Sequence, residues 1–358
     1  MAVHQIVGRA APASRATEAA LRLQPLLRRL GPSEIYAARP GPDLGGRIRP
    51  LAEFAARPGA GPPAVVVYHA GAGDPDVLSL LLDRREPILL IYQDVPPAES
   101  FSVLQPETAH RLASGVAQLS LLQPRIQLAL VDSAHTARQL RALGYPDVRV
   151  APLPVHLDGL REAEPHPPTW RHLQTQLQGP LVLCVAPMLP HERLDLVLQA
   201  YHALVTYLAP DVHLAVFGPV PVPAYLDVLQ GFLQKLELTR AWMQPEAGVE
   251  PLAAFYRSAT VFVTMSEHPG FCLPAVQALD FGLPVVGRAT GGVPETLAGA
   301  GLLLPSGAGP LLLAETLAAV LDDSGLRSAI AKSGQDRLAE LDPSAAEAAF
   351  LGHLAELL

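Results

Sequence analysis

Cysteine is scarce in this chain of 358 residues, and charged and aromatic residues are few as well. The two cysteines, Cys184 and Cys272, stand in apolar surroundings, which favours free buried thiols in a reducing compartment over a disulfide and gives a zinc site no support. No apolar run is long enough to cross a bilayer, and the amino terminus lacks the apolar segment of a signal peptide. We therefore expect a cytoplasmic protein without a metal site.

Neither half of the chain carries enough positive charge to suggest a nucleic-acid partner. Residues 1–158 carry 16 basic and 14 acidic side chains, whereas residues 159–358 carry 10 and 20. No basic stripe with interleaved aromatic residues is present, which excludes nucleic-acid binding. Arginines of the first expected helix, Arg15, Arg22, Arg28 and Arg29, leave two interpretations open: peripheral contact with the inner face of a membrane, or a solvated helix face.

The length of the chain predicts two domains, each large enough for its own core. Continuous apolar runs of strand length recur, and polar or turn residues and then a helical pattern follow each one, which is typical of parallel β-α units. The clearest runs cover residues 63–70, 87–94, 128–131, 181–185, 213–217 and 261–263. A polar stretch rich in proline and histidine, residues 158–180, separates the two sets, and we expect it to be a linker.

Residues 260–305 have the layout of an α/β ligand site. A buried strand is followed by a polar turn, a helical pattern and a second short strand. Gly291 and Gly292 then precede another expected helix, where free backbone N–H groups can hold an anion.

This stretch resembles the donor-sugar motif of the family-four (group 1) retaining glycosyltransferases, which have the GT-B fold. The matching segments are Ser266-Glu267-His268, Gly270-Phe271, Leu273-Pro274, Gly282, Pro284-Val285, Gly291-Gly292 and Pro294-Glu295. The resemblance implies an α/β fold of two Rossmann-like, doubly wound domains facing a cleft. It places an acceptor-side domain at residues 1–157, the linker at 158–180, a donor domain at 181–342, and at 343–358 a helix that returns to the first domain.

The resemblance also implies which residues contact the ligands. The expected donor-binding residues are Gly270, Phe271, Cys272, Leu273, Gly291, Gly292 and Glu295. Several of these could instead be present because the strand-helix-strand unit needs glycine in its turns and apolar groups in its core. In the first domain, His69 and Gln93 end two expected strands at the edge where doubly wound sheets bind ligands, which makes them catalytic candidates. A satisfied histidine at a strand end is the alternative for His69.

The chain departs from the family pattern at the positions that carry charge. Two glutamates separated by seven residues are the family signature, and Pro269 and Gln277 stand there. The arginine and lysine that hold the donor diphosphate are replaced by Pro187 and Glu192. Gln277 can still bind a ribose hydroxyl, whereas Pro269, at the catalytic glutamate position, cannot replace a carboxylate. Glu267 lies two residues earlier and is the catalytic candidate that could substitute for it, although a shift of that size would direct its side chain elsewhere.

Positive charge for the donor must then come from elsewhere, and Arg257 and Arg288 are the candidates in the sequence. We expect Arg288 to supply it, because it follows a strand whose carboxyl end faces the ligand. The alternative is that Arg288 points to solvent or pairs with Glu295 or Asp280.

Two functions remain open. The first is transfer of a hexose, with retention and without a metal or other cofactor, from a weakly bound nucleotide sugar to a saccharide or lipid-linked acceptor. The second is a catalytically degenerate GT-B protein that is a partner of another glycosyltransferase or senses a sugar ligand.

Overall fold

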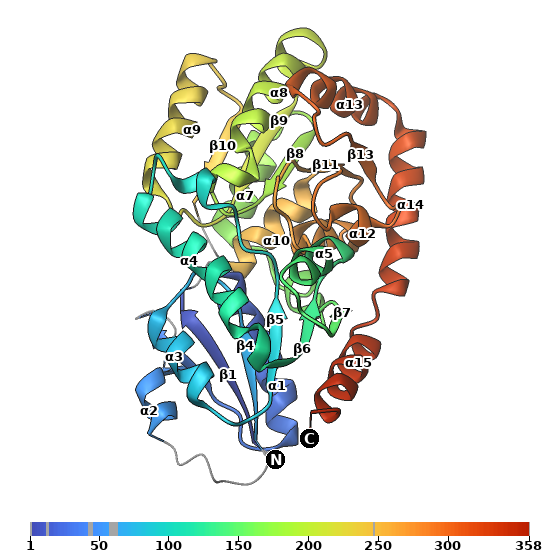
Figure 1. Ribbon diagram of the computed structural model, residues 1–358. Helices are drawn as coiled ribbons and strands as arrows, with labels where there is room; N and C mark the ends of the chain where they lie inside the picture. The colour runs from blue at the N-terminus through green and yellow to red at the C-terminus, as the bar shows by residue number, and fades with distance from the viewer. Residues whose placement is uncertain (1, 12–13, 42–45, 57–63, 246–247, 358) are drawn as a thin grey trace. The chain divides into compact units, whose positions relative to one another are not determined.

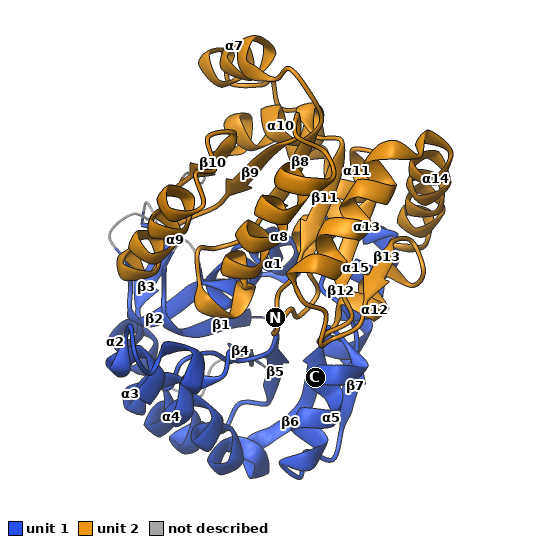
Figure 2. Ribbon diagram, turned by 90° about the horizontal axis from the view of Figure 1, so that it is seen from above, with its two compact units in different colours: residues 1–155, 342–358 blue, residues 156–341 orange. Residues whose placement is uncertain are grey.

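The computed structural model describes residues 2–11, 14–41, 46–56, 64–245 and 248–357. The chain forms two compact units (Figure 2). The first comprises residues 1–155 and 342–358, and the second comprises residues 156–341. Each unit is built around a parallel sheet, as the alternating apolar runs predict.

The sheet of the first unit has the strand order β3-β2-β1-β4-β5-β6-β7 in the described residues, with every pairing parallel. Its strands are β1 (Ala2–Arg9), β2 (Ile35–Arg39), β3 (Ile48–Pro50), β4 (Ala64–His69), β5 (Ile88–Tyr92), β6 (Ile126–Val131) and β7 (Val148–Val150). The central strands are buried along nearly their whole length. Such strands are expected where helices cover both faces of a parallel sheet.

Helices connect these strands (Figure 1). They are α1 (Arg15–Leu30), α2 (Leu51–Ala55), α3 (Pro75–Asp83), α4 (Pro106–Leu122) and α5 (Ala134–Ala142), with the short 3₁₀ helices η2 (Ala98–Phe101) and η3 (Gln123–Arg125). The last helix of the chain, α15 (Pro343–Ala355), also belongs to this unit. Its Phe350 and Leu354 pack into the same apolar core as Leu23 and Leu27 of α1.

The sheet of the second unit has the order β10-β9-β8-β11-β12-β13, again with parallel pairing throughout the described strands. Its strands are β8 (Leu181–Val185), β9 (His213–Phe217), β10 (Ala241–Gln244), β11 (Val261–Thr264), β12 (Val285–Arg288) and β13 (Leu302–Leu304). The strand order reverses between β8 and β11. In a doubly wound sheet the loops beyond the carboxyl ends of two such strands form the ligand site.

Ten helices of this unit have described bounds. They are α6 (Asp158–Arg161), α7 (Pro167–Gln176), α8 (Leu194–Tyr207), α9 (Pro223–Lys235), α10 (Val249–Ser258), α11 (Leu273–Asp280), α12 (Val293–Leu297), α13 (Pro310–Asp322) and α14 (Ser324–Glu340), with the 3₁₀ helix η4 (Pro190–Glu192) before α8. None of the described helices of the chain is both long and apolar enough to cross a bilayer.

The structure corrects the expectation that residues 158–180 are a linker. They contain the helices α6 and α7 and belong to the second unit. Leu160 and Leu173 are buried in the core of that unit, together with Leu181 and Phe255. The polar composition of the stretch reflects the exposed faces of two short helices, whereas the apolar positions that anchor them are too widely spaced to stand out in the sequence.

Candidate functional site

Two loops meet at the point where the strand order of the second unit reverses. Residues 186–193 connect β8 to α8, and residues 265–272 connect β11 to α11. The backbone N–H of Glu267, in the second loop, donates to the carbonyl of His191, in the first, at 2.8 Å. The two loops are therefore joined directly at the expected ligand edge of the sheet.

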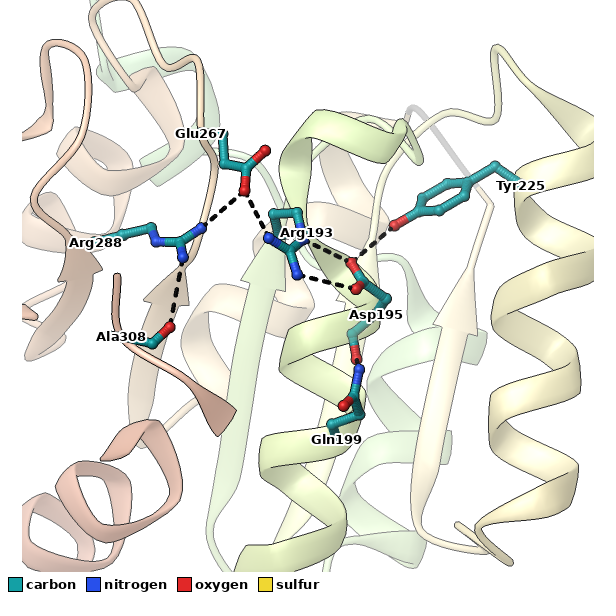
Figure 3. Close-up of polar contacts among 7 residues, drawn as sticks. All are labelled: Arg193, Asp195, Gln199, Tyr225, Glu267, Arg288 and Ala308. Atoms are coloured by element: carbon teal, nitrogen blue, oxygen red, sulfur yellow. Dashed lines mark hydrogen bonds and ion pairs between the residues drawn. The ribbon is translucent and has the colours of Figure 1, made fainter. Parts of the chain in front are cut away.

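Arg193 is a cation of this site that the sequence analysis missed. It has the left-handed backbone conformation, with φ of 54°, and its carbonyl accepts from the backbone N–H of Leu196 at the start of α8. Nη1 of its guanidinium lies 2.6 Å from Oε1 of Glu267 (Figure 3). Nε lies 3.1 Å from Oδ1 of Asp195, and hydrogen bonds to Asp195 and Glu267 raise the pKa of Arg193. A non-glycine residue in this conformation is strained, and such strain is concentrated at functional sites.

Arg288 lies on the other side of Glu267. It is the last residue of β12 and only 6% exposed. Nη1 lies 3.2 Å from the same Glu267 oxygen that Arg193 contacts, and Nη2 donates to the carbonyl of Ala308 at 3.5 Å (Figure 3). Arg288 therefore pairs with neither Glu295 nor Asp280. Its buried Nε–H has no hydrogen-bond partner among the described residues.

Glu267 thus links two arginines that are far apart in the sequence. We define the Glu267 cluster as Arg193, Asp195, Glu267 and Arg288, which carry two positive and two negative formal charges. Each arginine has donors directed at a carboxylate, the geometry that also suits a phosphate. The chemistry of this donor set fits an anionic oxygen ligand.

The glycine pair packs against Pro269, the residue that we expect at the family's first glutamate position. The backbone N–H of Gly292 donates to the carbonyl of Pro269 at 2.9 Å. Gly291 has φ of 52°, and a β-carbon there would lie 2.4 Å from the same carbonyl oxygen. Pro269 therefore shapes the glycine loop through its backbone. The hydroxyl of Thr290 adds a second link, donating to the carbonyl of Ser266 at 2.6 Å.

Gln277, the residue that we expect at the family's second glutamate position, lies on α11 and is half-buried. Its Oε1 accepts from the hydroxyl of Tyr256 at 3.2 Å, and the same hydroxyl lies 2.9 Å from the carbonyl of Pro274. The preceding Cys272 is left-handed, with φ of 50°, and its sulfur lies 4.0 Å from the hydroxyl of Thr264. Both cysteines are free thiols, as predicted, but only Cys184 is buried, whereas Cys272 is half-buried.

Pro187 and Glu192, which the resemblance assigns to the family's phosphate-binding positions, differ in exposure. Pro187 is half-buried, whereas the Glu192 side chain is buried, with Oε1 3.3 Å from Nε2 of His191. The carboxylate of Glu192 is thus paired within its own loop. It is Arg193, one residue later, that contacts Glu267.

The other predicted donor residues have structural contacts. Gly270 is buried, and Phe271 and Leu273 are half-buried. The carbonyl of Phe271 accepts from the hydroxyl of Thr296 at 2.7 Å. Glu295 is exposed in the first turn of α12, and its carbonyl accepts from Arg337.

His69 and Gln93 both lie at the carboxyl edge of the first unit's sheet. Nε2 of His69 lies 2.9 Å from Oε1 of Gln5, and burial lowers the pKa of this histidine to about 3. Nε2 of Gln93 donates to Oδ2 of Asp132 at 3.2 Å. His69 is therefore neutral and hydrogen-bonded at the end of β4. Its catalytic role stays a prediction.

Residues 171–337 match the family model of the group 1 glycosyl transferases. This part of the chain is similar to that family. Two curated D-inositol 3-phosphate glycosyltransferases are similar. The one from Frankia alni is 33% identical over 194 residues, 52% of this chain and 47% of that protein. The one from Corynebacterium efficiens is 41% identical over 88 residues, 24% of this chain and 20% of that protein. The chain thus spans less than half the length of these curated relatives.

Solved structures extend the similarity to the whole fold. Sucrose-phosphate synthase from Thermosynechococcus elongatus superimposes with a TM-score of 0.78 at 18% identity, covering 99% of this chain and 98% of that one. HepE from Anabaena, in complex with UDP-glucose, gives 0.79 at 15% identity, covering 99% and 100%. The prediction of a GT-B fold with two Rossmann-like sheets is confirmed.

Arg193, Asp195 and Tyr225 are the site residues that the sequence analysis missed. Asp195 accepts from both Nε and Nη2 of Arg193, at 3.1 and 3.3 Å, and the Tyr225 hydroxyl lies 3.5 Å from Asp195. One signal was available in the sequence. An arginine directly follows Glu192, the altered lysine position, and precedes a helix.

Proposed function

We propose that the protein transfers a hexose, with retention, from a nucleotide sugar to a saccharide or lipid-linked acceptor, and that Arg193 and Arg288 hold the donor diphosphate. The observation that carries this proposal is the position of both guanidinium groups at the switch point of the second unit's sheet. They stand in for the cations absent at Pro187 and Glu192. HepE, whose structure contains UDP-glucose, supports a nucleotide sugar as the ligand class.

Departure of a nucleoside diphosphate builds negative charge on the leaving oxygen. Preorganised cations stabilise that charge in the transition state, and removing one such group typically costs about 10²–10³ in rate. Arg288 is preorganised because it is buried and bonded to Ala308. Arg193 is preorganised by Asp195. The proposed reaction requires no metal ion.

The test compares Arg193→Ala and Arg288→Ala with the unaltered protein. We expect each substitution to weaken calorimetric binding of UDP-glucose or GDP-mannose about tenfold or more, and to lower transfer by about 10²-fold. Arg240→Ala is the matched control, because Arg240 precedes β10 at the opposite edge of the sheet and pairs with Asp211. Turnover that survives both substitutions contradicts the proposed role of the two arginines.

Loss of both family glutamates favours a second candidate, a catalytically degenerate partner of another glycosyltransferase. Pro269 offers only its backbone, and the Gln277 amide is engaged with Tyr256. Absence of turnover with every common donor, together with co-purification of a second transferase, would support this candidate.

A further inference from the structure

The Glu267 cluster carries no net formal charge. Arg193 and Arg288 are balanced by Asp195 and Glu267. A diphosphate brings at least two negative charges to this position, and it would meet repulsion from both carboxylates as well as attraction from both arginines. Binding of such a ligand would be stronger if one carboxylate moved away, because part of this repulsion would then be removed.

The two carboxylates differ in how firmly they are held. Asp195 lies in the first turn of α8, where a helix favours negative charge, and both its oxygens accept from Arg193. Glu267 lies in the loop between β11 and α11, its side chain is 38% exposed, and a single oxygen receives both arginines. Glu267 is the member of the cluster that can leave.

Groups beside Glu267 already have unused hydrogen-bonding capacity. The Nε–H of Arg288 is buried and has no partner in the described part of the chain, and the same holds for the hydroxyl of Ser266. Ser266 immediately precedes Glu267. Buried donors of this kind are normally satisfied by a ligand or an ordered water molecule.

We propose that Glu267 is an internal counter-ion that occupies the anion position of the empty site and that the donor diphosphate displaces. The carboxylate keeps both arginines positioned while no ligand is bound, and it neutralises Arg288, because a buried unpaired charge is costly. It also lowers the affinity for the donor, since the ligand must break two charge-assisted hydrogen bonds before it forms its own. This inference rests on the proposed function only for the identity of the anion.

Glu267→Gln tests the proposal. Glutamine keeps the shape of the side chain and one oxygen acceptor but removes the competing charge. We expect the variant to bind UDP, GDP and inorganic pyrophosphate about tenfold more tightly than the unaltered protein, a change of about 1.4 kcal/mol, as measured by calorimetry. Asp211→Asn is the matched control. It removes one negative charge at the amino edge of the same sheet, where Asp211 precedes β9, and it should change affinity by less than about twofold.

Each other outcome overturns the inference in a different way. Equal affinity of Glu267→Gln and the unaltered protein, with binding lost in Arg193→Ala, rejects the counter-ion role and leaves the proposed function intact. Weaker binding of UDP-glucose by Glu267→Gln, with UDP unaffected, shows that Glu267 contacts the sugar instead. Absence of binding in both proteins rejects the inference and the diphosphate-binding role together.

Discussion

Asp132 provides a test of how burial controls charge in the first unit. It follows β6, is 5% exposed, and accepts a hydrogen bond from Gln93. Burial raises the pKa of its carboxyl group from 3.8 to about 6, although hydrogen bonds from Gln93 and the backbone of Leu153 oppose the rise. The folded protein therefore binds more protons than the unfolded chain between about pH 4 and pH 6, and this group lowers stability as pH rises through that window.

Asp132→Asn removes this titration and keeps the side-chain shape. A shift of about two pKa units corresponds to about 3 kcal/mol, so we expect the variant to be about 1–3 kcal/mol more stable at pH 7.5 and nearly unchanged at pH 4. Its new NH₂ group can donate to Oε1 of Gln93, which has no partner among the described residues. Urea unfolding at several pH values, with probes in each unit, measures the difference.

The control for this experiment is Asp83→Asn, which removes a carboxylate from the exposed end of α3. It should leave stability within about 0.5 kcal/mol at every pH. A stability difference between Asp132→Asn and the unaltered protein that stays constant from pH 4 to pH 8, or that grows toward low pH, would refute the reasoning.

Two further predictions concern backbone conformation in the second unit. Gly291→Ala should destabilise the protein by about 1–3 kcal/mol, because the new β-carbon would lie 2.4 Å from the Pro269 carbonyl at a φ of 52°; a thermal midpoint within about 1 °C of the original would contradict this. Ala298→Gly should stabilise it by up to about 1 kcal/mol, because Ala298 ends α12 in the left-handed conformation, with φ of 45°, at an exposed position. A lower urea midpoint for Ala298→Gly than for the unaltered protein would contradict this prediction.

The strands and loops that surround the site could be predicted from the sequence, because local patterns of residues indicate them. Continuous apolar runs identify buried parallel strands, and the glycine pair before α12 marks a turn that only small residues allow. Arg288 could be predicted as a candidate cation of the site because it follows an apolar run that is expected to end at the ligand edge of the sheet. The start of the second unit was not predicted, because the sequence of α6 and α7 is mostly polar and its few core residues, such as Leu160 and Leu173, do not form a continuous apolar run.

By itself, the sequence determined the fold class and the two parallel sheets. Its resemblance to the family predicts that charged residues are replaced at Pro187, Glu192, Pro269 and Gln277. Only the tertiary structure decided where the remaining charges lie. Arg193 and Glu267 are 74 positions apart, and they meet because β8 and β11 are neighbours in the sheet. Ion pairs between loops depend on which strand ends adjoin, and the raised pKa of Asp132 depends on burial by distant segments. Neither the ion pairs nor the raised pKa can be predicted from a short stretch of the sequence.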